Sequence, residues 1–102
     1  LFKKAISLRI EELCSIKNIT VNKLAEMSTV PPSTLRDIVN CKVENPSSTV
    51  IYQICKTLRI SLKEFFDSEL FDKLDVLMSY FQYQLYFYIF LLNALHQNIY
   101  YL

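Results

Sequence analysis

Few residues in this chain could carry covalent or metal chemistry. The three cysteines, Cys14, Cys41 and Cys55, are widely spaced and form no CxxC pair, and the single histidine, His96, lies far from them in sequence. This pattern fits neither the ligand spacing of a zinc site nor the even count of a disulfide framework. Reduced thiols in a cytosolic protein are the simpler interpretation, and no metal or other cofactor is expected.

The same residues argue against an enzyme. One histidine supplies no Ser–His–Asp arrangement, and a chain without glycine cannot form the Gly-rich loop that cradles a phosphate. Cys14 and Cys55 lie on apolar helical stretches, where a buried thiol is the usual case, whereas Cys41 lies in a loop. We therefore expect a binding protein.

Charge is distributed unevenly along the chain, although the formal net charge is only +1. Residues 1–59 hold nine Lys and Arg against five Asp and Glu, residues 60–75 hold two against five, and residues 76–102 hold none of either sign. This basic excess permits a nucleic-acid partner without requiring one. Charged residues follow the opening lysines where a secretory signal would be apolar, so a cytoplasmic location is expected.

The elements that must position a binding surface are predicted to be helices. The 102 residues are 52% hydrophobic and include three prolines and no glycine, which favours one small helical domain over a turn-rich β fold. Apolar residues recur at helical spacing over residues 6–13, and this helix should end near Asn18. Thr20 is a suitable N-cap for a short helix over residues 21–27, and Pro32 suits the first position of a third helix.

Two more helices are predicted after a loop over residues 40–46. Ser47 caps the fourth helix, and Ser61 begins a capping box with Glu64 that starts the fifth. Five short helices within residues 1–70 predict a compact all-α bundle with short connections.

The second and third helices match the helix-turn-helix plan, because a turn of only three or four residues joins them. Ala25 is small, which allows the two helices to cross closely. The angle between them would be fixed by the larger apolar residues Leu24, Val30, Leu35 and Ile38. That angle lets the N-terminal part of the third helix stand in a DNA major groove.

In these features the sequence resembles the Cro and phage-repressor-like regulators, often called the Xre family. The resemblance is carried, in order and at the family's spacing, by Ile19-Thr20, Lys23-Leu24-Ala25-Glu26, Val30-Pro31-Pro32-Ser33-Thr34-Leu35, Asn45-Pro46-Ser47 and Ile60-Ser61-Leu62. It covers about residues 5–68. It implies a five-helix lambda-repressor-like bundle that binds double-stranded DNA and regulates transcription.

The resemblance also implies which residues meet DNA. The recognition helix would present Pro32, Ser33, Thr34, Arg36 and Asp37, and the phosphates would be met by Thr20, Asn40 and Lys42. Arg36 could bind guanine bidentately and Asp37 could accept from a cytosine amino group, while the two hydroxyls could reach base edges or phosphates. The alternative is an ordinary structural role, with Arg36 paired to a neighbouring acid.

Several positions depart from the family pattern. Val21 stands where the family often has a glutamine that meets phosphate. Thr29 and Cys41 replace common glycines, and a left-handed backbone at Thr29 would cost roughly 1–2 kcal/mol. Cys14 and Val39 replace a frequent Arg–Glu pair and are expected to pack near each other. Such an apolar replacement is often neutral or stabilising.

The expected function is a transcriptional regulator that acts by occluding an operator, more simply a repressor than an activator. The family usually dimerises on a pseudo-palindromic site with half-sites about 34 Å apart, so a homodimer is expected. The alternative is a protein–protein interaction module on the same scaffold, because a fold alone does not prove function. Asp37 and Glu44 favour that alternative, whereas Arg36 and Lys42 oppose it.

The C-terminal segment has a different composition. An acidic hinge is predicted over residues 71–75, followed by an uncharged, aromatic-rich tail over residues 76–102. Three interpretations stay open: a sixth helix that packs on the domain or on a twin tail, a membrane anchor that tethers the regulator, and a non-native extension from a shifted reading frame. Residues 76–95 are long enough to span a bilayer, although Ser, Gln and Asn residues interrupt them.

Overall fold

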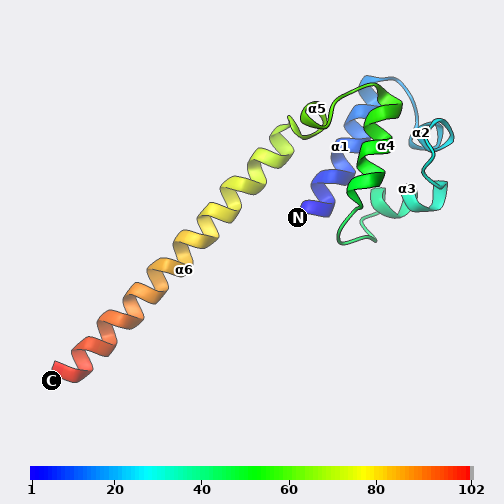
Figure 1. Ribbon diagram of the computed structural model, residues 1–102. Helices are drawn as coiled ribbons and strands as arrows, with labels where there is room; N and C mark the ends of the chain where they lie inside the picture. Colours follow the sequence, from blue (N-terminus) through cyan, green and yellow to red (C-terminus); the bar gives the residue numbers. More distant parts are fainter. Residues whose placement is uncertain (102) are drawn as a thin grey trace. The chain divides into compact units, whose positions relative to one another are not determined.

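The computed structural model of the chain describes the backbone of residues 1–101 and the side chains of residues 1–74 and 82–96. Over these residues the structure contains six α-helices and no strand (Figure 1). The all-α class predicted from the sequence is confirmed, and the first five helices are those of the predicted bundle. The helices are α1 (Phe2–Ile16), α2 (Val21–Met27), α3 (Pro32–Val39), α4 (Ser48–Leu58), α5 (Leu62–Phe66) and α6 (Glu69–Tyr101). The chain divides into two units, Leu1–Asp72 and Lys73–Leu102.

The boundary between α1 and α2 follows the local signals in the sequence. Asn18 adopts the left-handed conformation, with φ of 55°, and the next amide, that of Ile19, donates to the Cys14 carbonyl at 2.9 Å. This bond satisfies a carbonyl that the helix end would leave without a partner. The Thr20 hydroxyl then accepts from the Lys23 amide at 3.0 Å and caps α2. Both expectations are confirmed.

The turn between α2 and α3 is held by one serine. The Ser28 hydroxyl donates to the Ala25 carbonyl and accepts from the Val30 amide, both at 3.3 Å. Thr29 has no left-handed backbone, so the strain considered for it does not arise. Pro32 occupies the first turn of α3, where a missing N–H costs nothing.

Serine caps also begin the next two helices. The Ser47 hydroxyl accepts from the Thr49 amide at 3.2 Å, and the Ser61 hydroxyl accepts from the Glu64 amide at 3.0 Å. The capping box is confirmed in this half only, because the Glu64 carboxylate accepts from the Ser61 hydroxyl at 3.4 Å. Between these helices, α4 ends at Arg59, which has a left-handed backbone with φ of 57°.

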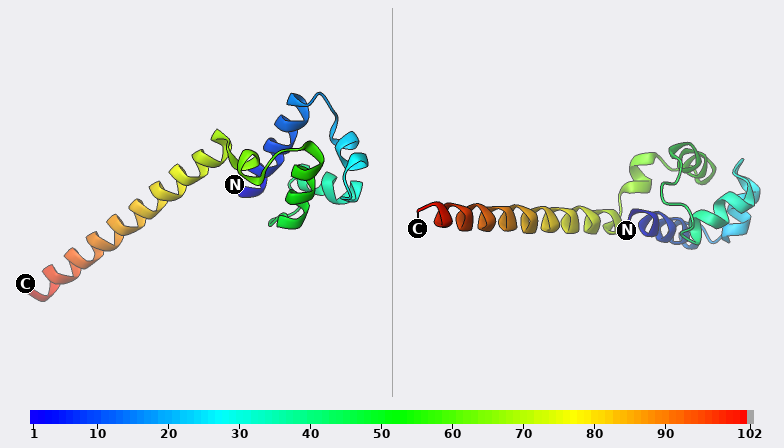
Figure 2. Two further views of the ribbon diagram at one scale, coloured as in Figure 1. Left: turned by 45° about the horizontal axis from the view of Figure 1, so that its top comes forward. Right: turned by 90° about the horizontal axis from the view of Figure 1, so that it is seen from below.

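The helices α1 to α5 of the first unit pack together (Figure 2), and one apolar core joins them. Helix α3 contacts α1 and α2, and helix α4 contacts α2 and α5. The buried side chains of this core are Ile6, Ile10, Leu13, Cys14, Leu24, Ala25, Val30, Leu35, Ile38, Ile51, Ile54, Cys55, Leu58 and Phe65. Every apolar residue that was predicted to fix the angle between α2 and α3 belongs to this set.

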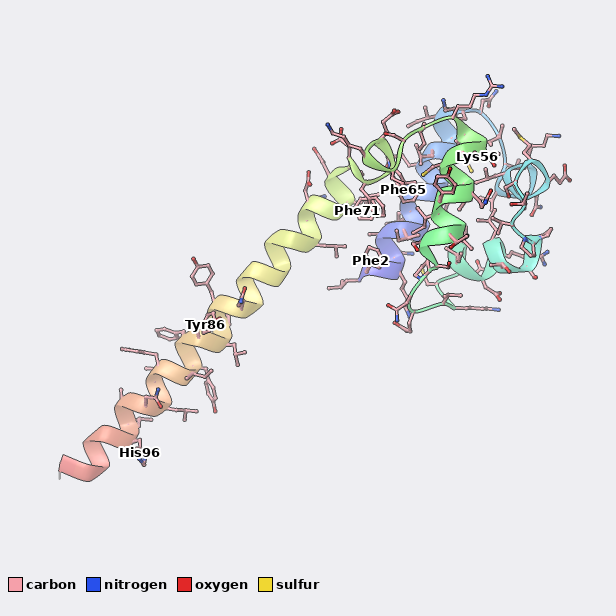
Figure 3. The ribbon with its side chains drawn as sticks, in the orientation of Figure 1. Phe2, Lys56, Phe65, Phe71, Tyr86 and His96 are labelled. Atoms are coloured by element: carbon pink, nitrogen blue, oxygen red, sulfur yellow. The ribbon has the colours of Figure 1, made fainter. Side chains whose placement is uncertain are left out.

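An aromatic cluster closes the core beside α5. Figure 3 shows Phe2, Phe65 and Phe71 lying near one another. The Phe71 ring centroid lies 6.4 Å from that of Phe2, 6.2 Å from that of Phe65 and 5.0 Å from that of Phe66. Tilted and edge-on contacts at such distances add to the stabilisation from area burial. The first turn of α6 therefore belongs to the first unit.

Arg9 is a buried cation that ties α1 to the end of α5. Its side chain is 9% exposed, and it donates from Nε to the Phe65 carbonyl and from Nη2 to the Glu64 carbonyl, each at 2.7 Å. The last carbonyls of a helix have no partner within it, and they carry partial negative charge. Arg9 satisfies two of them and places a positive charge where α5 favours one.

The second unit is the long part of α6. Residues 71–75, for which the charge pattern predicts a hinge, lie inside this helix and contain the boundary between the two units. The described part of the tail is helical as far as Tyr101. Every described side chain from residue 82 to residue 93 is exposed. A membrane anchor was one interpretation of the tail. Within the described part of the chain, no helix has the combination of length and apolarity that a bilayer crossing requires.

Candidate nucleic-acid interface

The helix-turn-helix is built from α2, the Ser28 turn and α3. Leu35 and Ile38 are 0% and 2% exposed and anchor one side of α3 in the core. Leu24 and Ala25 of α2 are buried with them. The small Ala25 side chain leaves room for the close approach that was predicted from its size. Helix α3 is therefore fixed by its buried side, and its opposite side is free to meet a partner.

Four polar residues share that outward side of α3. Ser33, Arg36, Asp37 and Asn40 are separated by three, four and seven residues, which places them in one stripe along a helix. All four are exposed. The structure thus brings together most of the residues predicted to meet DNA. Pro32 is exposed at the start of the same helix, whereas Thr34 is half-buried beside it.

The N-terminal end of α3 offers free donors. Pro31 stands at the N-cap position and provides no side-chain cap. Within the described part of the chain, no acceptor meets the backbone amides of Ser33 and Thr34. Exposed amides at a helix N-terminus carry partial positive charge and form a ready site for phosphate oxygens.

The predicted phosphate contacts flank the stripe. Thr20 is exposed at the start of α2, and Asn40 and Lys42 are exposed after α3. Cys41 lies between them with φ of 59°, and this turn allows the Lys42 amide to donate to the Asp37 carbonyl at 2.9 Å. Cys41 therefore holds the left-handed position in which the family often has glycine.

The charges near this surface are partly compensated. Lys3 and Glu44 form an ion pair at 2.5 Å; the hydrogen bond raises the pKa of Lys3 and lowers the pKa of Glu44. Glu44 had favoured a protein partner as an uncompensated acid, and this pairing weakens that argument. No carboxylate of the described residues lies within ion-pair distance of Arg36 or Lys42. The alternative in which Arg36 pairs with a neighbouring acid is absent from these residues.

The departures from the family pattern leave no charge buried here. Val21 is half-buried against the core in place of a phosphate-binding glutamine. Cys14 is buried and Val39 half-buried in the same core, while direct contact between them stays a prediction. The Ser7 hydroxyl donates to the Val39 carbonyl at 2.5 Å, which ties α1 to the end of α3. Sequence reasoning missed this bond because it joins residues far apart in the chain.

No metal chemistry is evident among the described residues, which contain no cluster of three His, Cys, Asp or Glu side chains able to hold an ion. The three cysteines are free thiols. Burial raises the pKa of the Cys14 and Cys55 thiols, so both stay protonated near neutral pH.

Comparisons with known proteins agree with this geometry. The profile of the Cro/C1-type HTH DNA-binding domain matches residues 9–69. Among solved structures, the crystal structure of the clp gene regulator ClgR from C. glutamicum is similar, with a TM-score of 0.57 and 24% sequence identity over 65% of this chain and 84% of that one. No curated protein sequence matches with significance. The structural likeness shows a shared fold, and the match over residues 9–69 shows that the chain belongs to the Cro/C1-type helix-turn-helix DNA-binding domain family.

Proposed function

We propose that this protein is a sequence-specific transcriptional regulator whose helix α3 reads the major groove of double-stranded DNA. The observation that carries the proposal is the exposed stripe of Ser33, Arg36, Asp37 and Asn40 on a helix fixed by its buried side. A rigid helix with an outward polar stripe is what base readout requires, since the side chains must reach base edges at fixed positions. The similar ClgR structure is that of a gene regulator, which supports a regulatory role.

The residues of this surface divide by task. Arg36 binds guanine through two parallel hydrogen bonds, and Asp37 accepts from a cytosine amino group. The Ser33 and Thr34 amides at the start of α3 bind a phosphate, and their hydroxyls reach the same phosphate or a base edge. Thr20 caps α2 through its oxygen lone pair, which leaves its hydroxyl hydrogen for a phosphate.

Two residues after α3 complete the phosphate contacts. Asn40 donates from its amide and Lys42 contributes a charge that has no acidic partner among the described residues. Such contacts set the register of the helix in the groove and carry no sequence information. One domain offers few of them, so the protein acts as a homodimer on a pseudo-palindromic site and represses by occluding an operator.

The test begins with selection of the DNA sequences that the full chain binds from a random pool. Labelled duplex DNA of the selected sequence is then titrated with the full chain at several salt concentrations, and binding is measured by fluorescence anisotropy. Affinity should fall steeply with salt, because each phosphate contact releases counterions. Arg36→Ala should weaken binding to the selected site by about 1–3 kcal/mol and relax the preference at one base pair. Lys42→Ala should weaken binding to all sequences alike and lower the salt slope by about 1.

The matched control is Lys63→Ala, which removes an exposed cation from α5, outside the helix-turn-helix. It should leave both the affinity and the salt slope nearly unchanged. A folded chain that binds no DNA at low salt would refute the proposal. That result would support the alternative, a protein–protein interaction module on the same scaffold.

A further inference from the structure

The long helix of the second unit exposes a row of large apolar side chains. Its side chains are between 44% and 76% exposed at Tyr83, Leu85, Tyr86, Phe87, Tyr88, Ile89, Phe90, Leu91, Leu92 and Leu95. Contiguous exposed apolar patches of more than roughly a few hundred Å² mark interaction surfaces in soluble proteins. Because residues 76–102 carry no Asp, Glu, Lys or Arg, no charge offsets the cost of exposing this surface to water.

The sequence of residues 78–102 holds an unbroken heptad repeat. Spacings of three and four residues alternate through Met78, Phe81, Leu85, Tyr88, Leu92, Leu95, Ile99 and Leu102. All eight positions are apolar. The polar residues of the tail all stand outside the repeat: Ser79, Gln82, Gln84, Asn93, His96, Gln97 and Asn98. A strict seven-residue repeat is the pattern of a helix that supercoils around another helix, with these residues at the seam.

The described part of this seam is open. Leu85, Tyr88, Leu92 and Leu95 are 58%, 61%, 48% and 60% exposed. At a coiled-coil seam each of these side chains would insert between four residues of a facing helix. The geometry points to another helix with the same repeat as the occupant of this surface.

We propose that the tail forms a coiled coil with the tail of a second copy of this chain, and that this seam holds the protein as a dimer. The lack of charge favours self-pairing, because the positions that flank a seam set partner choice through their charges, and identical charges there would repel a second copy. Here the flanking residues Gln82, Gln84, Ile89 and Leu91 carry none. The proposal does not depend on DNA binding.

The available area is sufficient for a stable dimer. Burying one large apolar side chain contributes about 1.5–3 kcal/mol at about 25 cal/mol per Å², which corresponds to roughly 60–120 Å². The four described seam residues and the flanking Ile89 and Leu91, in each of two copies, would therefore bury roughly 700–1,400 Å² in total. Specific interfaces begin at about 1,000 Å², so these six residues alone reach the lower range of a stable complex.

The test compares two double variants of the full chain by sedimentation velocity over a range of protein concentrations. Leu85→Gln with Leu92→Gln removes two seam residues seven positions apart. Tyr83→Gln with Phe90→Gln removes two exposed aromatic residues, also seven positions apart, on the side of the helix away from the seam; they are 76% and 65% exposed, against 58% and 48% for the seam pair. The unaltered chain should sediment as a dimer. The seam pair should raise the dimer Kd at least about 100-fold, and the control pair should change it less than about 10-fold.

Thermal unfolding of the N-terminal domain accompanies each measurement and should be the same in both variants, which shows that the seam pair does not act by unfolding the domain. A monomeric unaltered chain at 100 µM, a larger or polydisperse species, or equal weakening by the two pairs would overturn the proposal. Flotation with vesicles of phosphatidylcholine and phosphatidylglycerol distinguishes a lipid partner. If the chain binds these vesicles and both pairs weaken binding equally, the tail is a lipid-binding helix and not a dimer seam.

Discussion

Cys41 occupies a backbone position that suits glycine. Its φ of 59° places a Cβ where the left-handed conformation crowds the following carbonyl, at a cost of roughly 1–2 kcal/mol. The Cys41 thiol donates only a long hydrogen bond to the Lys3 carbonyl oxygen, at 4.0 Å, and this bond offsets little of the backbone strain. Cys41→Gly removes the strain but adds the larger entropy of a glycine in the unfolded chain. We expect a net gain of about 0.5–1 kcal/mol in the free energy of unfolding, measured by urea denaturation.

The control for this substitution is Thr29→Gly in the other turn beside α3. Thr29 does not adopt the left-handed conformation, so glycine there relieves no strain and only increases the entropy of the unfolded chain. It should lower the free energy of unfolding by about 0.5–1 kcal/mol. If both substitutions change stability in the same direction, backbone strain at Cys41 is not the cause.

The three thiols should differ in reactivity. Cys14 and Cys55 are buried and their pKa values are raised, so few thiolates form in the folded protein near pH 8. Cys41 is half-buried. Titration with a disulfide reagent should detect one thiol in the folded chain and three in urea, and Cys41→Ser should abolish the fast phase. Because their folded pKa values exceed the unfolded ones, the buried thiols contribute stability at neutral pH that declines as the pH rises above about 8.5.

Residue-level expectations from the sequence succeeded where the signal was local. The Thr20, Ser47 and Ser61 caps were predictable because donor and acceptor lie within three residues of each other. Arg9 was not, because it bonds carbonyls that lie 55 and 56 residues along the chain. In sequence it is one more polar residue on the outer face of a helix, and only the packing of α5 against α1 buries it.

At the scale of elements, the Arg9 bonds hold the short helix α5 in place. Five residues are too few for a helix that is stable alone, so α5 depends on its caps and on tertiary contacts. Arg9→Met fills the same space but leaves the Phe65 carbonyl without a donor, whereas the Glu64 carbonyl keeps the Asp67 amide at 3.3 Å. We expect a loss of about 1–3 kcal/mol in the free energy of unfolding, the cost of one unsatisfied buried group, measured by thermal or urea unfolding.

The matched control for Arg9 is Glu12→Gln, which removes the ion pair at 3.3 Å on the exposed side of the same guanidinium. The Glu12 side chain is 46% exposed, and an exposed pair of this kind contributes about 0–1 kcal/mol. Equal losses in the two variants would show that the ion pair, and not the bonds to α5, holds Arg9. Proteolysis confined to the segment around α5 in Arg9→Met would locate the loosened element.

The predicted elements were placed well because α2, α4 and α5 begin at a capping Thr or Ser and α3 begins at a proline, and the longer helices show an apolar period. The candidate site followed from the resemblance, since exposed Ser, Thr and Arg residues have no periodic signal of their own. Structure was needed to show that Ser33, Arg36 and Asp37 share one outward stripe while Thr34 turns aside. The hinge expected over residues 71–75 stays a prediction: the boundary between the two units falls within it, while its residues are helical. The acidic residues Glu69 and Asp72 lie in the first turn of α6, where negative charge favours the helix N-terminus.

At the scale of the whole molecule, the division after Asp72 separates a domain with its own core from the rest of α6. A chain that ends at residue 75 keeps every buried residue of that core, together with Phe71. It should therefore unfold cooperatively with a midpoint within a few degrees of that of the full chain, measured by circular dichroism. A shortened chain that fails to fold would show that the tail belongs to the domain.

The shortened chain also tests whether a dimer formed through the tail increases the affinity for DNA. On a duplex with one half-site, the two chains should bind with similar affinity, because the residues of the recognition surface are the same. On a duplex with two half-sites about 34 Å apart, a dimer held by its tails binds the second half-site at millimolar effective concentration. The full chain should then bind this duplex at least roughly 100-fold more tightly than the shortened chain. The measurement is an anisotropy titration at protein concentrations below the Kd for the single half-site. Equal affinity of the two chains for the double site would show that the tail plays no part in DNA recognition. If the shortened chain also loses affinity for the single half-site, the tail itself contacts DNA.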